Sequence, residues 1–120
     1  MSRQQTEKLW REEKYRVMFF SQKHYNEIRL AMRDKTPHEQ IEALIQDALL
    51  QTPSEGSKRN ACQHMWGYFR NMATPEEKLK YETLLEHDEI TTLLILLQQL
   101  ADRYNVAYLQ ESTILQNDSR

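Results

Sequence analysis

Apolar residues recur along the first third of the chain at the three- and four-residue spacing of one helical face. The stripe consists of Trp10, Val17, Met18, Tyr25, Ile28 and Met32. Thr6 precedes the stripe, and a threonine hydroxyl can accept a hydrogen bond from a free backbone N–H in the first turn of a helix. The pattern therefore predicts a first helix from about Thr6 to about Arg33.

Two Thr-Pro signatures predict the starts of two further helices. Residues 36–39 (TPHE) and 74–77 (TPEE) each place Thr at the cap, Pro at the first helical position and Glu three residues after the Thr. This arrangement is typical of a capping box. The first signature predicts a second helix to about Gln51, and the second predicts a fourth helix to about His87.

The remaining segments predict a loop, a third helix and a fifth. Residues 52–57 (TPSEGS) have a loop composition, and a third helix is expected over about 57–72. Residues 89–104 (EITTLLILLQQLADRY) are apolar nearly all round at their centre, so they predict a buried helix. Asn105 can end that helix in a left-handed conformation. Residues 106–115 are expected to form either a strapping segment or a short helix.

These elements predict an all-α single domain over residues 1–120, with about five helices around one core and a frayed tail from about 116 to 120. Only two Gly and three Pro occur, which favours long helices.

No stretch approaches the roughly 18 apolar residues of a membrane span, and the first residues lack the apolar run of a secretory signal. The single Cys excludes an internal disulfide framework, which favours a reducing cytoplasm.

Catalytic and metal chemistry is not indicated by the residue spacing. Cys62 and His64 are two residues apart, so on a helix they face different directions and form no local thiolate–imidazolium pair. The four histidines, at positions 24, 38, 64 and 87, are scattered without metal-ligand spacing. We therefore expect no metal, no cofactor and no catalysis by this chain alone.

The charge distribution is more informative than the net charge of −2. Residues 1–35 carry a net charge of +4, residues 36–56 carry −4, residues 57–72 carry +3 and residues 73–120 carry −5. If the first and third predicted helices pack side by side, the protein has one strongly positive face. The alternative is that these local averages have no functional meaning.

A glycine interrupts the polar side of the third predicted helix. At 100° per residue, the core side consists of Cys62, Met65, Trp66, Phe69 and Met72. Asn60, His64, Gly67 and Asn71 gather on the opposite side, flanked by Gln63, Tyr68 and Arg70. Glycine inside a helix costs about 1 kcal/mol relative to alanine. Either a ligand approaches this surface closely, or Gly67 gives way to a large residue of the first helix.

Two polar residues, Lys14 and Ser21, interrupt the apolar stripe of the first predicted helix. Lysine is almost never fully buried without a partner. Lys14 therefore either lies along aromatic rings or reaches a polar pocket shared with the third helix. Such a pocket would be an anion site lined by Lys14, Arg11, Ser21, Gln22, His64 and Asn60. Glu12 and Glu13 are expected to point elsewhere.

Three segments together resemble the YbgA-like domain family. Residues 9–28 (LWREEKYRVMFFSQKHYNEI) are similar to its opening signature of Trp, Lys, Tyr, Met, Ser and Tyr. Residues 60–78 (NACQHMWGYFRNMATPEEK) are similar to the second signature, with its His–x–x–Gly–Tyr–Phe core. Residues 93–110 (LLILLQQLADRYNVAYLQ) are similar to the third, which ends in a Tyr–Leu pair. The resemblance covers essentially the whole chain.

The resemblance implies an RNA-binding or substrate-presenting module. Members of the family occur alone, or fused to an iron–sulfur domain that removes sulfur from thiouracil bases, where the YbgA-like part is implicated in holding tRNA that carries 4-thiouridine. Carried over by position, it points to Trp10, Lys14, Tyr15, Ser21, Tyr25, Asn60, His64, Gly67, Tyr68 and Arg70. One Cys cannot hold an iron–sulfur cluster, so desulfidase activity is not carried over. Residues 110–118 (QESTILQND) also depart from the family's usual close.

The sequence thus predicts a non-catalytic nucleic-acid-binding accessory module for tRNA or another structured RNA. Phosphate contacts are expected from Lys8, Arg11, Lys14, Arg16, Lys58, Arg59 and Arg70. Base or sugar contacts are expected from Asn60, Gln63, His64 and Tyr68, and Tyr15, Ser21, Gln22 and Gly67 complete the predicted site. Two alternatives are a protein-interaction module that docks on a separately encoded desulfidase or DNA-repair enzyme, and an enzyme on small nucleotides that uses Lys14 and His64. The oligomeric state is not predicted.

Overall fold

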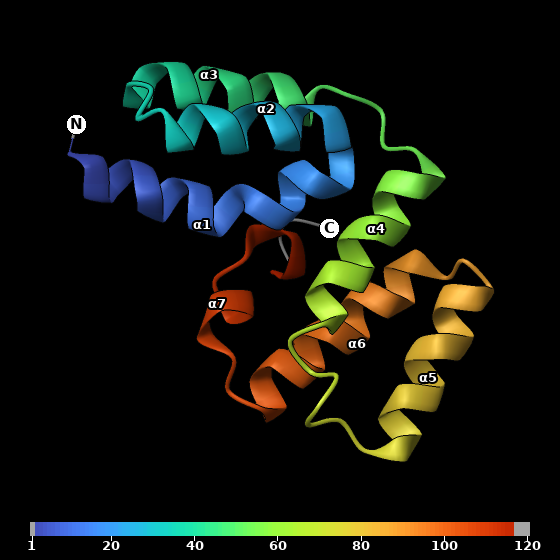
Figure 1. The fold of residues 1–120 in the computed structure, drawn as a ribbon. Coiled ribbons are helices and arrows are strands. Elements are labelled where there is room, and N and C mark those ends of the chain that lie inside the picture. The colour runs from blue at the N-terminus through green and yellow to red at the C-terminus, as the bar shows by residue number, and fades with distance from the viewer. Residues whose placement is uncertain (1, 117–120) are drawn as a thin grey trace.

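The computed structural model describes residues 2–116, and all of the regular structure in that range is helical (Figure 1). The elements are α1 (Arg3–Phe20), α2 (Gln22–Arg33), α3 (His38–Leu49), α4 (Glu55–Trp66), α5 (Pro75–Glu86), α6 (Ile90–Arg103), α7 (Ala107–Gln110) and the 3₁₀ helix η1 (Thr113–Leu115). The all-α fold class is confirmed. The expected tail is mostly outside the described residues, since only residue 116 of it falls within them.

The first predicted helix is wrong in one important respect, because the chain breaks at Ser21. Ser21 has an extended backbone (φ −161°, ψ 110°) and separates α1 from α2, which folds back along α1 (Figure 1). Its N–H donates to the Val17 carbonyl at 2.8 Å, and its hydroxyl accepts from the His24 N–H at 3.2 Å. Ser21 thus ends one helix and caps the next.

The amino-terminal caps also differ from two of the predictions. Ser2, not Thr6, caps α1, and Thr6 is buried with its hydroxyl 2.9 Å from His38 Nδ1. Pro37 rather than Thr36 stands at the cap of α3, where no side chain provides a capping hydrogen bond. The predicted box at Thr74 is confirmed, with Pro75 at the first position of α5.

Helix α1 lies between two hydrophobic clusters and contributes to both. Trp10 and Val17 pack with Ile28 of α2 and with residues of α3. Tyr15 and Met18 pack with the second, larger cluster, which is built on α4, α5, α6 and the carboxy-terminal segment. Leu93 and Leu97 of α6 are fully buried there, as predicted for the apolar helix. The core is therefore divided in two, and α1 joins the halves.

Helix α4 is shorter than predicted and shifted toward the amino terminus. It begins at Glu55, where Ser54 and Ser57 form a capping box, and it ends at Trp66. Met72 lies beyond the helix and is 46% exposed, so its assignment to the core is wrong. The other four residues of the predicted core face, Cys62, Met65, Trp66 and Phe69, are buried.

The carboxy-terminal segment packs across α1 and α6. Asn105 has a positive φ of 52°, which confirms the predicted left-handed end of α6. The segment then forms α7 and η1, so it is both a short helix and a strap. The Thr113 hydroxyl donates to the Glu13 carboxylate at 2.8 Å and fastens the strap to α1.

Candidate functional site

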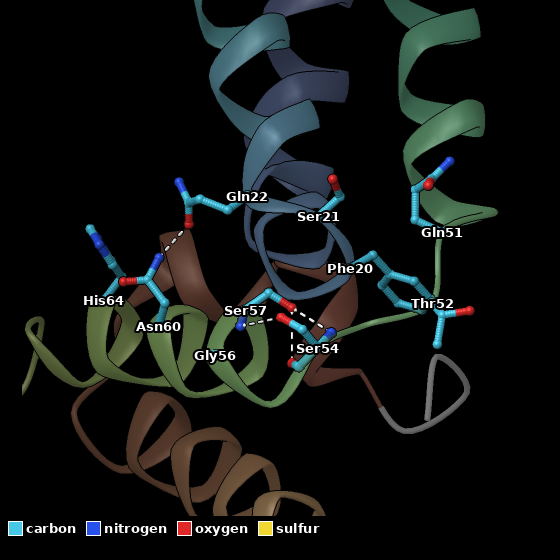
Figure 2. Close-up of a pocket in the computed structure, with 10 residues that line it drawn as sticks. All are labelled: Phe20, Ser21, Gln22, Gln51, Thr52, Ser54, Gly56, Ser57, Asn60 and His64. Atoms are coloured by element: carbon cyan, nitrogen blue, oxygen red, sulfur yellow. Dashed lines mark hydrogen bonds between the residues drawn. The ribbon is translucent and has the colours of Figure 1, made fainter.

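A groove opens where α1 and α2 meet the loop before α4. It encloses about 620 Å³ and is lined by Phe20, Ser21, Gln22, Gln51, Thr52, Ser54, Gly56, Ser57, Asn60 and His64 (Figure 2). We call it the joint groove. Four of these residues, Ser21, Gln22, Asn60 and His64, belong to the predicted site, so the structure brings together residues from two of its predicted helices.

Two contacts hold the walls of the joint groove in place. The Ser57 hydroxyl, in the first turn of α4, donates to the Phe19 carbonyl of α1 at 2.8 Å. The Asn60 side-chain amide donates to the Gln22 carbonyl oxygen (Figure 2). The predicted packing of the first helix on the third is therefore present, because α1 and α4 make the most extensive of the helix contacts in the described range.

A second hollow continues from the joint groove along α4. It encloses about 310 Å³ and is lined by Asn60, Gln63, His64, Gly67 and Arg70. All five residues belong to the predicted site. Asn60 and His64 line both hollows, so the two hollows form one continuous polar surface. We call the second hollow, along α4, the α4 surface.

Gly67 is not inside a helix, so the expected helix-interior cost does not arise. It caps the carboxy end of α4 with an ordinary right-handed backbone (φ −52°, ψ −28°). A Cβ at this position would lie 3.1 Å from the His64 carbonyl oxygen, and among the described residues only the α4 backbone comes within 4 Å of it. The prediction that Gly67 gives way to a large residue of the first helix is therefore wrong.

The predicted phosphate-binding cations are largely neutralised by carboxylates. Five of the seven form ion pairs: Lys8–Glu12 (2.9 Å), Arg11–Glu111 (3.6 Å), Arg16–Glu13 (3.5 Å), Lys58–Glu55 (3.6 Å) and Arg59–Asp88 (3.4 Å). Glu12 and Glu13 do not line the hollows that contain Ser21, Asn60 and His64, but they pair with Lys8 and Arg16. Within residues 2–116 only Lys14 and Arg70 of the seven lack a carboxylate partner. The positive face is therefore weaker than the sequence count suggests.

Three tyrosines gather beside the end of α4, and we call them the tyrosine cluster. The hydroxyls of Tyr15 and Tyr68 are 2.9 Å apart, and their rings meet edge to face. Tyr108 stacks on Tyr68 with ring centroids 5.9 Å apart. The Arg11 guanidinium lies 5.0 Å from the centre of the Tyr108 ring, and Lys14 Nζ lies 5.7 Å from the centre of the Tyr15 ring. Cations at these distances are attracted by the ring faces.

The contacts of Lys14 decide between the two alternatives that the sequence left open. Lys14 lies along the tyrosine rings, and neither it nor Arg11 lines the joint groove. The predicted anion pocket that combines these cations with Asn60 and His64 is therefore not formed. Burial lowers the pKa of Lys14, and the nearby positive charge of Arg29 lowers it further. Lys14 and Arg29 thus present two positive charges near one another, and Arg29 also acts on Tyr25.

Burial also determines how the tyrosines ionise. It raises the pKa of Tyr15, and the hydrogen bond with Tyr68 raises it further. Burial likewise raises the pKa of Tyr25 and of Tyr108, with Tyr68 adding to the effect in both. Tyr15, Tyr25 and Tyr108 therefore stay neutral at physiological pH and add no negative charge to this surface.

Ser21, His24 and Asp47 are connected by hydrogen bonds at the rim of the joint groove. Ser21 Oγ lies 2.7 Å from His24 Nδ1, and His24 Nε2 lies 2.9 Å from Asp47 Oδ2. The Ser21 hydroxyl also accepts the His24 N–H, and the Asp47 side chain is 61% exposed. The Ser21 oxygen is therefore used as a helix cap, and the chain of bonds fastens α2 to α3.

Other reactive groups have structural roles. Cys62 is fully buried, and burial raises the pKa of its thiol to about 12, which suits the predicted core residue and not a nucleophile. In the part of the chain that the structure describes, no three His, Cys, Asp or Glu side chains come together as metal ligands. None of the described helices is long and apolar enough to cross a membrane.

Sequence reasoning missed several residues of the site. Tyr108 lies far along the chain from Tyr15 and Tyr68, so no local spacing links the three. Arg29 lies one helical turn after Tyr25. It was missed because a continuous first helix over residues 6–33 puts Arg29 near its carboxy end, far from Arg11 and Lys14. Phe20 and the loop residues of the joint groove were missed because the break at Ser21 was not predicted.

A family model described as "Protein of unknown function (DUF1722)" matches residues 14–118. The match covers most of the chain, from the middle of α1 to beyond η1. The chain therefore belongs to this family, whose description assigns no activity. Comparisons with curated proteins and with solved structures gave no match.

Proposed function

We propose that this member of the DUF1722 family is a YbgA-like, non-catalytic module that binds tRNA or another structured RNA. The observation that carries the proposal is the tyrosine cluster, where Lys14 lies against aromatic rings beside the polar α4 surface. Tyr68 is 37% exposed. Aromatic faces next to cations are the combination with which proteins bind unpaired nucleotides, because bases stack and phosphates are neutralised.

The strength of the electrostatic part can be estimated from the unpaired cations. Lys14, Arg29 and Arg70 form no ion pair within residues 2–116. Each phosphate contact changes the slope of log K against log salt by about −0.7 for a single strand, so three contacts give about −2. Engagement of all seven predicted cations would instead give about −5.

The test is a filter-binding series with bulk tRNA between ~50 and ~200 mM salt. Lys14→Gln should weaken binding several-fold and make the salt slope shallower by about 0.7. Lys78→Gln, which removes an exposed charge on α5, a helix that holds none of the three tyrosines, is the matched control and should change neither. Absence of salt-sensitive binding at micromolar protein would overturn the proposal.

The same experiment addresses the alternative, a module that docks on a separately encoded desulfidase or DNA-repair enzyme. That function predicts no RNA binding by the purified protein. It also predicts a partner enzyme that stays bound in a pull-down from nuclease-treated lysate. Loss of that partner on Arg70→Ala would assign the docking surface to the end of α4.

A further inference from the structure

The lining of the joint groove has a chemical character that differs from its surroundings. It combines one aromatic side chain, Phe20, with amide, imidazole and hydroxyl groups. The described residues that line it include no carboxylate, lysine or arginine. An uncharged polar lining suits the edge of a neutral, flat, hydrogen-bonding ligand.

The joint groove is large enough to hold a small ligand. Its volume of about 620 Å³ falls in the range of pockets that hold one small molecule. The positive charge lies outside it, with Arg70 on the adjoining α4 surface. A ligand with a neutral part in the groove and an anionic part beside Arg70 would therefore match both hollows.

Two side-chain amides, those of Asn60 and Gln22, lie together at one end of the joint groove. Asn60 donates one N–H to the Gln22 carbonyl oxygen, and Gln22 Nε2 makes a longer contact of 3.4 Å with Asn26. The Asn60 carbonyl oxygen remains as an acceptor, and a further N–H of Gln22 remains as a donor. Figure 2 shows these two side chains next to one another at one end of the groove.

We propose that the joint groove holds one unpaired nucleobase of the bound RNA, with Asn60 and Gln22 at its hydrogen-bonding edge. This inference rests on the proposed function and specifies the part of the RNA that is recognised. A base inside a duplex does not fit, because its Watson–Crick edge is occupied by its partner strand. The adjacent phosphate lies toward Arg70.

The experiment compares a single-stranded RNA dodecamer with the same strand in a perfect duplex. Electrostatics alone favours the duplex, because its charge density is higher. We expect the single strand to bind roughly tenfold more tightly, and Asn60→Ala to remove most of that preference. Gln22→Ala provides a second variant if Asn60→Ala fails to fold. Gln46→Ala, an exposed amide on α3 outside the groove, is the matched control.

The outcomes separate this inference from the proposed function. Salt-sensitive binding that is equal for single strand and duplex would overturn the base site and leave RNA binding intact. A single-strand preference that survives both Asn60→Ala and Gln22→Ala would also overturn it, because the base would then lie elsewhere. Absence of any salt-sensitive RNA binding would overturn both proposals.

Discussion

Replacing Ser21 by alanine tests the break between α1 and α2, which Ser21 caps. The hydroxyl accepts the His24 N–H at 3.2 Å as the cap of α2, and it lies 2.7 Å from His24 Nδ1. Loss of a serine cap costs about 1 kcal/mol, and loss of the second hydrogen bond costs about 1 kcal/mol more. Ser21→Ala should therefore lower the free energy of unfolding by about 2 kcal/mol.

The sign of the effect distinguishes two structures. If residues 6–33 formed one continuous helix, alanine would be the better residue at position 21 by up to about 0.7 kcal/mol, and the variant would be more stable. With the observed break, alanine is destabilising because it leaves the first turn of α2 without its acceptor. Ser21→Asp, which retains a capping oxygen, should remain close to the wild type.

Urea denaturation followed by circular dichroism provides the measurement. With a slope of about 2 kcal/mol per molar urea, a loss of 2 kcal/mol lowers the midpoint by about 1 M. A Ser21→Ala midpoint equal to or above that of the wild type would contradict the broken helix. Equal losses for Ser21→Ala and Ser21→Asp would show that capping is not the cause.

Two further predictions concern groups outside the site. The hydrogen bond from Tyr104, followed by that from the Thr74 N–H, holds the pKa of Glu77 below its ordinary value of 4.5. The stability from this carboxylate is present above pH 4.5 and is lost as the pH falls through the lowered pKa, so Glu77→Gln should flatten the acid limb of a stability–pH profile, and an unchanged limb would refute this. Because Cys62 is buried with a raised pKa, Ellman's reagent should label it in urea but not in the native protein, and rapid native labelling would contradict the burial.

The helical periodicity identified the fold class but concealed the break at Ser21. Tyr25 and Ile28 continue the helical spacing of Trp10 and Val17 in the sequence. All four pack on one cluster, but they do so from two helices, since α2 folds back along α1. A serine followed three residues later by histidine is a weaker cap signal than Thr-Pro-x-Glu. The Thr74 box was predictable, since cap and acidic partner are neighbours in the sequence.

The candidate site was predictable only where its residues share one helix. Asn60, His64 and Gly67 follow the spacing of α4, and they line one surface. The charge balance was predictable only in part: Lys8–Glu12, Arg16–Glu13 and Lys58–Glu55 are pairs within one helix. Arg11 and Arg59 are paired with Glu111 and Asp88 from distant segments, which no local spacing indicates. Exposed ion pairs each stabilise a fold by only about 0–1 kcal/mol. Their main effect here is to neutralise charge on the positive face.

The joint groove lies where α4 meets α1 and α2, so a ligand bound there affects how these helices pack. Phe20 and Gln22 lie at the break between α1 and α2, whereas Asn60 and His64 belong to α4. The Ser57–Phe19 and Asn60–Gln22 hydrogen bonds connect α4 to α1 and to α2 at this point. A base held by Gln22 and Asn60 would contact α2 and α4 at once and would stabilise their native arrangement by mass action. Binding and the packing of α4 against α1 and α2 would then be one coupled equilibrium, because loss of that packing removes the groove.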